Sequence, residues 1–246
     1  MADVRVPGPR GPMPAYLADP EVVAGERTPG VLVIHDVFGM SDDLRRQADW
    51  LASEGYLALA PDFFHFGSKP ACIRSVFRDL KERGGRSFAE AEAARTWLAE
   101  HQSSNGRVGV IGFCMGGGFA LLLAPGHDFK AASVNYGQVP PDADDFLAQA
   151  CPVVGSFGGR DRALRGAARR LEGALERAGV PHDVKEYPDA GHGFMNGHNS
   201  VLMRVAGVLF GVGYHEASAT DARRRIVEFF DAYLKAEPPP PGGTGG

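Results

Sequence analysis

Short apolar runs alternate along this chain with longer segments of helical periodicity. The apolar runs cover residues 30–36, 56–62, 106–113, 130–137, 152–159 and 182–188, and the helical segments cover 41–55, 88–101, 114–124, 142–150, 162–179 and 219–235. A continuous apolar run such as GVLVIHD is typical of a strand that is buried on both faces. The alternation predicts an α/β fold with a mostly parallel central sheet of about seven or eight strands and helices on both faces.

The chain is long enough for one large α/β domain. Its 246 residues are 44% hydrophobic and 23% charged, close to globular averages, so we expect a substantial core. No linker or repeat interrupts residues 1–236, which predicts a single domain there and a disordered Pro/Gly tail at 237–246. Region 63–87 matches no single pattern, and 194–218 is a long insertion before the last helix. Both segments are candidate covers for a pocket, and whether 194–218 is a lid stays open.

Charge and cysteine content exclude several classes of partner. The formal net charge is −4, and no lysine- or arginine-rich run resembles a nucleic-acid footprint. No window approaches the roughly 18 apolar residues of a membrane span, and the N-terminal stretch lacks the apolar core of a signal peptide. Three cysteines, an odd number, argue against a disulfide scaffold. We therefore expect a cytoplasmic monomer or homodimer that binds a small molecule and neither nucleic acid nor membranes.

The stretch GVIGFCMGGG places a cysteine where a strand is predicted to pass into a helix. Gly112 and Gly116 lie two residues on either side of Cys114, which is the thiol form of a nucleophile elbow. Glycines at these positions avoid clashes in a tight turn that holds the thiol above the carboxyl edge of the sheet. The following helix directs its N-terminal dipole and free N–H groups at the sulfur, which favours a thiolate. A buried structural cysteine is the alternative interpretation.

A thiol nucleophile needs a base, and the base needs an acid that orients it. In elbow enzymes the three groups come in the order nucleophile, acid and histidine, on loops after successive strands. Asp161 ends the segment GGRD, and His192 lies in DAGHGF, each directly after an apolar run. Asp161 also fits a helix cap, and His192 also fits an ordinary loop. The order and placement of the three residues favour a triad of Cys114, His192 and Asp161.

Metal and nucleotide sites are disfavoured by the sequence. His35, His65 and His198 do not have the paired spacing of a zinc motif, and H-E-x-x-H is absent. The glycines around Cys114 follow neither the G-x-G-x-x-G order nor the G-K-[ST] ending of a phosphate loop. We therefore expect no cofactor and no bound metal.

The segments GFCMGG, GGRD and AGHGF resemble the dienelactone hydrolase family, cysteine-dependent enzymes of the α/β-hydrolase fold. The segments VLVIHDVFGM, GYLALAPDFF and SNGRVGVIGFCMGG share the resemblance, which covers about residues 14–235. By position it implies that Cys114 is the nucleophile, Asp161 the acid and His192 the base. The combination of motifs is specific to the family and far less specific to a substrate.

The stretch HDVFG carries further implications of the resemblance. The backbone N–H groups of Val37 and Met115 correspond to the oxyanion hole. The family usually has a glutamate where this chain has Asp36, and that carboxylate is thought to take the thiol proton when substrate binds. Aspartate keeps the charge but is one methylene shorter. Asp36 is therefore a candidate for activating the thiol, the alternative being that it only hydrogen-bonds loop backbone.

A second departure concerns the arginines that hold the substrate carboxylate in authentic dienelactone hydrolases. One of them follows the catalytic histidine, where this chain has Met195 and Asn196. The other falls in region 70–87, where the candidates are Arg74, Arg78, Arg83 and Arg86. The classical dienelactone is therefore only one of the possible substrates. Aromatic residues near predicted strand ends are candidates for the pocket lining: Phe38, Phe113, Tyr136 and Phe194.

Together these residues predict a hydrolase of small esters or lactones that works through an acyl-enzyme. Two alternatives use the same fold. One is a thioesterase or acyl transferase with the same triad, which faster turnover of thioesters would indicate. The other is a binding or redox-sensing protein, which thiol labelling without ester turnover would indicate. The sequence does not define the natural substrate or the size of its acyl group.

Overall fold

The described residues form one eight-stranded sheet that confirms the predicted fold class. A computed structural model of the chain describes residues 1–21, 26–197 and 213–235. The strands run in the order β1-β2-β4-β3-β5-β6-β7-β8 across the sheet. Pairing is antiparallel from β1 to β2 and from β2 to β4, and parallel elsewhere. Their bounds are β1 Ala2–Gly8, β2 Gly11–Ala18, β3 Thr28–Ile34, β4 Leu57–Pro61, β5 Ser104–Phe113, β6 Ala132–Asn135, β7 Val153–Gly158 and β8 His182–Tyr187.

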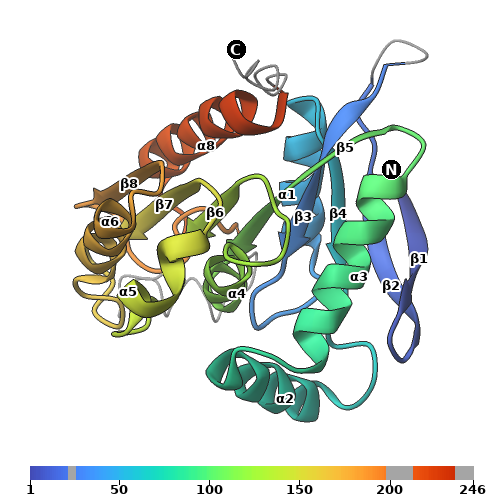
Figure 1. Ribbon diagram of the computed structural model, residues 1–246, viewed down its shortest axis with the longest axis horizontal. Helices are drawn as coiled ribbons and strands as arrows, with labels where there is room; N and C mark the ends of the chain where they lie inside the picture. Colours follow the sequence, from blue (N-terminus) through green and yellow to red (C-terminus); the bar gives the residue numbers. More distant parts are fainter. Residues whose placement is uncertain (22–25, 198–212, 236–246) are drawn as a thin grey trace, which may run out of the picture.

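Helices cover both faces of the sheet. In Figure 1, α3 and α4 lie in front of the strands and α1 lies behind them. The short α5 continues into a 3-10 turn, Leu147–Gln149, and α8 continues into a π-helical turn, Asp231–Lys235. The bounds of the helices are α1 Asp42–Ser53, α2 Lys69–Glu82, α3 Arg86–Glu100, α4 Met115–Leu123, α5 Ala143–Phe146, α6 Ala167–Ala178 and α8 Glu216–Phe230.

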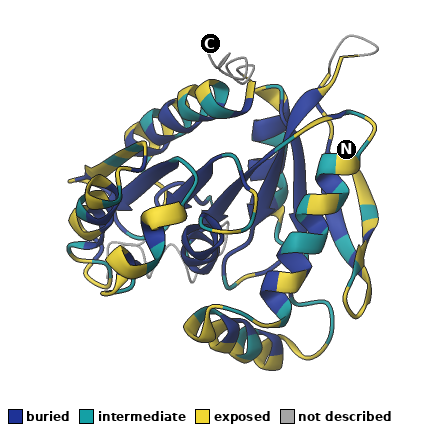
Figure 2. Cartoon of the chain, viewed as in Figure 1, coloured by how far each residue is buried: buried dark blue, intermediate teal, exposed yellow. Residues whose placement is uncertain are grey.

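Two hydrophobic cores sandwich the sheet, because alternate side chains of a strand point to opposite faces. On β3, Leu32 and Ile34 pack into a core shared with α3, α4 and α6. Val31 and Val33 pack into a second core shared with α1 and α8. All four side chains are fully buried, and Figure 2 shows the central strands as buried throughout. This double burial explains why the run at 30–36 is continuously apolar.

The N-terminal hairpin was not predicted from the sequence. Residues 2–18 form β1 and β2, although the stretch VPGPRGPMP is rich in proline and glycine, which normally indicate a loop. Pro7 is tolerated because β1 is an edge strand, and Pro12 and Pro14 precede the part of β2, Ala15–Ala18, that pairs with β4. The hairpin therefore extends the sheet at the edge farthest from β8.

Helix α2 occupies most of region 63–87, which the sequence left unassigned. Its buried residues are Cys72, Val76 and Asp79, a narrow stripe that contains a carboxylate and so gives a weak helical pattern. Figure 2 shows α2 at the periphery with much of its surface exposed. The predicted helix at 162–179 begins later, at Ala167, because residues 161–166 form a loop. No helix within the described ranges is long and apolar enough to cross a bilayer.

Candidate active site

Cys114 lies at the junction of β5 and α4, as the elbow motif predicts. It adopts a left-handed backbone conformation with φ 56°, which is rare for a residue other than glycine. Its N–H donates to the carbonyl of Asn135 at 3.0 Å, which fixes the turn to the end of β6. The thiol is half-buried. Backbone strain of this kind persists only when the surroundings enforce it, and here it presents the sulfur at the carboxyl edge of the sheet.

The two glycines of the motif are required by close backbone contacts. A Cβ atom on Gly112 would lie 1.8 Å from the carbonyl oxygen of Gly116, and one on Gly116 would lie 2.3 Å from that of Ile34. Real Cβ atoms do not approach backbone atoms this closely. The first turn of α4 is therefore packed directly onto the ends of β5 and β3, which confirms the predicted reason for both glycines.

Asp161 and His192 are brought together from loops after β7 and β8. The Nδ1 atom of His192 lies 2.6 Å from Oδ2 of Asp161, whose side chain is almost fully buried. The other oxygen, Oδ1, accepts hydrogen bonds from the N–H groups of Ala163 and Leu164 at 3.0 and 3.3 Å. Asp161 thus organises its own loop and contacts the imidazole at the same time; it does not cap a helix as the alternative expected, because α6 begins only at Ala167 with Gly166 at its N-cap.

Backbone contacts join these two loops. A Cβ atom on Gly158 would lie 2.5 Å from the carbonyl oxygen of Gly191, so only glycine allows the approach. Beside it, the N–H of Arg160 donates to the carbonyl of Ala190 at 2.9 Å. The distance between Asp161 and His192 is therefore set by main-chain packing and not by flexible side chains.

His192 lines the same cavity as Cys114, and the thiol acts on the pKa of the imidazole. Burial alone would lower the pKa of His192, but the hydrogen bonds to Asp161 and Cys114, together with their charges, raise it to about 10. Burial also opposes ionisation of Asp161, but the bond and charge of His192, together with the N–H groups of Ala163 and Leu164, outweigh it and hold the pKa of Asp161 below its usual value. The arrangement favours a charged imidazolium beside the sulfur.

The backbone groups expected to form an oxyanion hole lie on two neighbouring loops. Met115 is the first residue of α4, where N–H groups have no partner within the helix. Val37 follows β3, whose residue Ile34 pairs with Gly112 of β5. Buried His35 supports this loop, because its Nδ1 contacts the Asp36 carbonyl at 2.7 Å and its Nε2 accepts from the Phe63 N–H at 3.2 Å. Burial lowers the pKa of His35, which keeps it neutral for both bonds.

Asp36 is buried beside the same edge of the sheet. Its Oδ1 accepts a hydrogen bond from the Phe38 N–H at 2.8 Å, which is the backbone role weighed as an alternative. Its charge also acts on the Tyr136 hydroxyl, as does that of Cys114. The Asp36 carboxylate and the Cys114 sulfur are therefore both near enough to raise the pKa of the Tyr136 hydroxyl.

A cavity of about 710 Å³ opens over Cys114 and His192. Of the four aromatic residues expected to line a pocket, Tyr136 does so. Phe113 and Phe194 belong instead to the buried core behind the site, because they lie on the face of the sheet covered by α1 and α8. Phe38 is 40% exposed and is not part of this lining. Four lining residues come from α2 and its C-terminal end: Phe77, Leu80, Lys81 and Arg83.

A buried polar chain behind His192 was not predicted from the sequence. The Tyr136 hydroxyl donates to Oδ1 of Asn196, and Nδ2 of Asn196 donates to Oδ2 of Asp43 at 2.6 Å. Asp43 also accepts from the N–H of Gly197 at 2.8 Å. The ring of Tyr136 meets the ring of His192 edge-on, with centroids 5.4 Å apart. The chain therefore ties the segment after His192 to α1, a long-range contact that no local motif signals.

The remaining arginine and histidine candidates fall into different surroundings. Among the four arginines considered for substrate binding, Arg83 lines the cavity, whereas Arg74 and Arg78 are exposed on α2. Arg86 pairs with Glu90 at 3.4 Å, and His65 approaches the same carboxylate at 3.3 Å. His198 lies outside the described residues. Within those residues no group of three potential metal ligands comes together.

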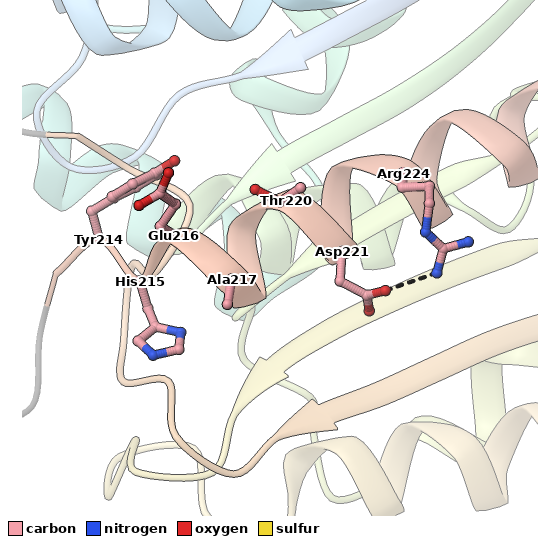
Figure 3. A pocket seen from close by; sticks show the side chains of 7 residues that line it. All are labelled: Tyr214, His215, Glu216, Ala217, Thr220, Asp221 and Arg224. Atoms are coloured by element: carbon pink, nitrogen blue, oxygen red, sulfur yellow. Dashed lines mark hydrogen bonds and ion pairs between the residues drawn. The ribbon is translucent and has the colours of Figure 1, made fainter.

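A second cavity, of about 700 Å³, lies at the start of α8 (Figure 3). Its one aspartate, Asp221, pairs with Arg224 and with Lys185, each at 2.7 Å. Its histidine, His215, caps α8 through Ser218. No residue expected to be catalytic lines this cavity, so we assign it no role in the chemistry.

The fold is that of an α/β-hydrolase. The crystal structure of "Putative Dienelactone Hydrolase" from Klebsiella pneumoniae superposes with a TM-score of 0.77 at 27% identity, covering 94% of this chain and 98% of that one. A Pyrococcus horikoshii acylaminoacyl peptidase superposes with a TM-score of 0.70 at 14% identity, covering 97% of this chain and 42% of that one. The second likeness concerns the fold alone.

The model of the dienelactone hydrolase family matches residues 13–234, so the chain belongs to that family of ester hydrolases. A Salmonella typhimurium protein named "Putative carboxymethylenebutenolidase" is 30% identical, over 93% of this chain and 86% of that one. The carboxymethylenebutenolidase of Rhodococcus opacus is 29% identical, over 94% of this chain and 90% of that one. The resemblance drawn from the motifs is thereby confirmed.

Proposed function

We propose that this protein hydrolyses small esters or lactones through a Cys114–His192–Asp161 triad and a thioester acyl-enzyme. The observation that carries the proposal is the pairing of His192 with Asp161 at 2.6 Å in the lining of the same cavity that Cys114 lines. The left-handed turn at Cys114 and the cavity above it support the same function, because they give a carbonyl carbon access to the sulfur.

In the first half of the reaction the Cys114 thiolate attacks the carbonyl carbon of the ester. The C–S bond forms while the carbonyl electrons move to the oxygen, which the N–H groups of Val37 and Met115 stabilise. Losing one such donor typically costs about 2.7–4 kcal/mol. The intermediate then collapses, the C–O bond breaks, and the alkoxide takes the proton of the His192 imidazolium. For a lactone the alcohol stays attached to the acyl group.

In the second half the neutral imidazole removes a proton from water as the water attacks the thioester. The second tetrahedral intermediate expels the Cys114 thiolate and releases the acid, which restores the imidazolium–thiolate pair. Asp161 holds the Nδ1–H throughout, so Nε2 always faces the reacting atoms. We further propose that Asp36 assists formation of the thiolate, in addition to its bond with the Phe38 N–H.

The partner in this proposal is a small-molecule ester. All three cysteines are free thiols, which supports the expected reducing, cytoplasmic environment. Whether the protein is a monomer or a homodimer stays a prediction.

The test is the hydrolysis of 4-nitrophenyl acetate by a Cys114→Ala variant. We expect kcat to fall by roughly 10³-fold or more, since removal of the nucleophile disables the triad as a unit. Cys151→Ala is the matched control, because burial raises the pKa of Cys151 to about 12 and leaves it inert. Turnover by Cys114→Ala at the wild-type rate would overturn the mechanism.

Thiol labelling separates catalysis from a redox-sensing role. Cys72 is fully buried and Cys151 resists ionisation, so iodoacetamide should react at Cys114 alone. If Cys114 is catalytic, a slowly hydrolysed ester should protect its thiol from labelling. Ester turnover by the protein should also fall in proportion to the fraction of Cys114 that is labelled. Labelling without any ester turnover by the unmodified protein would favour the sensor instead.

A further inference from the structure

The cavity above Cys114 and His192 has a lining that is both apolar and charged. Its apolar side chains include Leu122 of α4, Leu164 of the Asp161 loop, and Phe77 and Leu80 of α2. The charged residues in the lining, apart from His192, are Lys81, Arg83 and Asp142. An acyl group bound to the sulfur therefore shares the cavity with apolar walls and with these three side chains.

Arg83 and Asp142 are already paired with each other. Nη2 of Arg83 lies 2.5 and 2.6 Å from the two carboxylate oxygens of Asp142. Arg83 terminates α2 in a left-handed conformation with φ 52°, and its guanidinium lies 4.5 Å from the ring centroid of Phe146. Asp142 stands at the N-cap position of α5, yet its side chain makes no cap bond. Both side chains are thus committed to a contact between α2 and the segment before α5.

The pairing of Arg83 with Asp142 affects how well the site binds a substrate that carries a carboxylate. A carboxylate that enters the apolar cavity loses hydration, which costs several kcal/mol unless a partner replaces the water. Arg83 could offer a substrate carboxylate only its Nε and Nη1 atoms, because Nη2 is bound to Asp142, and the two carboxylates would then lie side by side. Lys81 is exposed, so its ammonium stays hydrated and compensates little.

We propose that the Arg83–Asp142 pair makes this site selective for uncharged esters with an apolar acyl group. The inference rests on the proposed function, because it concerns the acyl group attached to Cys114. Arg83 and Asp142 are specificity-determining residues here, and neither touches the reacting atoms.

The experiment compares two 4-nitrophenyl esters of similar length, the heptanoate and the monoester of adipic acid. In the second a carboxylate replaces the terminal ethyl group of the first. We expect wild-type kcat/KM to favour the heptanoate by roughly tenfold or more, since desolvation of the carboxylate is uncompensated. A wild-type enzyme that hydrolyses the adipate ester as efficiently as the heptanoate would overturn the proposal.

Asp142→Asn should free Arg83 and raise the ratio of adipate to heptanoate efficiency by about tenfold, because a released guanidinium can bind the substrate carboxylate. Asp142→Asn with Arg83→Gln should restore the wild-type ratio, since no free cation then remains. Asp144→Asn is the matched control: Asp144 is two residues away, pairs with Arg177 at 2.7 Å and does not line the cavity. An equal change of ratio in Asp144→Asn, or none in Asp142→Asn, would contradict the proposal.

Lys81→Met addresses the other cation in the lining. If Lys81 held the substrate carboxylate, its removal would lower efficiency on the adipate ester selectively, which would also overturn the proposal. Failure of the proposed function is recognised separately, because Cys114→Ala would then hydrolyse both esters. An inactive Cys114→Ala together with an unchanged ratio in Asp142→Asn contradicts the selectivity alone.

Discussion

The side-chain amide of Asn196 donates to the carboxylate of Asp43 at 2.6 Å, across 153 residues of sequence. The same amide accepts from the hydroxyl of Tyr136, whose ring meets the ring of His192. Asn196 thus ties α1 to the loop that carries His192, the proposed base. A polar chain without water access can serve this role only when each member keeps its partner.

Asn196→Ala should impair both folding and catalysis. The change leaves Tyr136 and Asp43 without their buried partner, which should lower the free energy of unfolding by about 1–3 kcal/mol. Because the His192 loop loses its support, kcat should fall by roughly tenfold with a smaller change in KM. Urea unfolding and steady-state kinetics measure these effects, and Asn105→Ala, at an exposed position near the start of β5, is the control. A stable variant with unchanged kcat would show that the chain does not position the base.

The imidazole of His192 should titrate near its raised pKa of about 10. Asp161→Asn and Cys114→Ala each remove a hydrogen bond and a charge that stabilise the imidazolium, so each should move the pKa down, toward about 6.5. NMR titration of ¹³C-labelled histidine measures the shift, and the spectrum of His192→Gln assigns the signal. An unchanged pKa in both variants would contradict the contacts described for this ring.

Activity should follow the same ionisation in a way that depends on the leaving group. An alkoxide must receive the proton of the imidazolium, so kcat/KM for an ethyl ester should fall as the pH rises through about 10. A 4-nitrophenolate leaves without a proton, so its ester should show no such fall. Parallel pH profiles for the two esters would argue against His192 as the acid.

Asp36→Asn distinguishes the two roles of Asp36. The amide oxygen can still accept from the Phe38 N–H, so the loop and the free energy of unfolding should change little. The charge is lost, and acylation measured in single turnover should slow by roughly tenfold if the carboxylate assists the thiol. Acylation at the wild-type rate would leave Asp36 with its backbone role alone.

Gly116 and Gly118, two residues apart in α4, should respond oppositely to alanine. A Cβ on Gly116 meets the Ile34 carbonyl at 2.3 Å, so Gly116→Ala should destabilise the protein by about 1–3 kcal/mol or more. A Cβ on Gly118 meets its nearest neighbour, the Gln138 nitrogen, at 3.7 Å, and Gly118→Ala should stabilise by about 0.5–1 kcal/mol. Urea unfolding of both variants checks the contrast, which equal effects would contradict.

Local patterns in the sequence predicted the sheet and the order of the triad residues. Strand β3 is recognisable because both of its faces are buried. The elbow is recognisable because the backbone contacts on either side of Cys114 require glycine at positions 112 and 116. The hairpin β1–β2 was missed because its prolines imitate a loop, although they lie on the edge strand β1 and on the part of β2 that does not pair with β4. Helix α2 was equally hard to recognise, because its buried residues form only a narrow stripe and one of them is a carboxylate.

The parts of the site that the sequence did not reveal depend on contacts between distant segments. Asn196 pairs with Asp43, and Arg83 with Asp142, across loops whose approach is set by the whole fold. Phe113 and Phe194 were expected in the pocket because they lie near strand ends, but both are buried in the core behind it: side-chain alternation on β5 directs Phe113 there, and Phe194 packs there from the loop after β8. Periodicity locates an element along the chain and does not specify which of its neighbours a polar side chain meets.

The attachment of α2 has a consequence for how this enzyme can diverge. The helix supplies several residues of the cavity lining, whereas its buried residues, Cys72, Val76 and Asp79, are not part of that lining. Substitutions at the exposed residues Phe77 and Lys81 leave those three buried residues and both cores intact. New acyl specificities are therefore accessible to descendants of this gene by small steps that never pass through an unfolded or chemically inert intermediate.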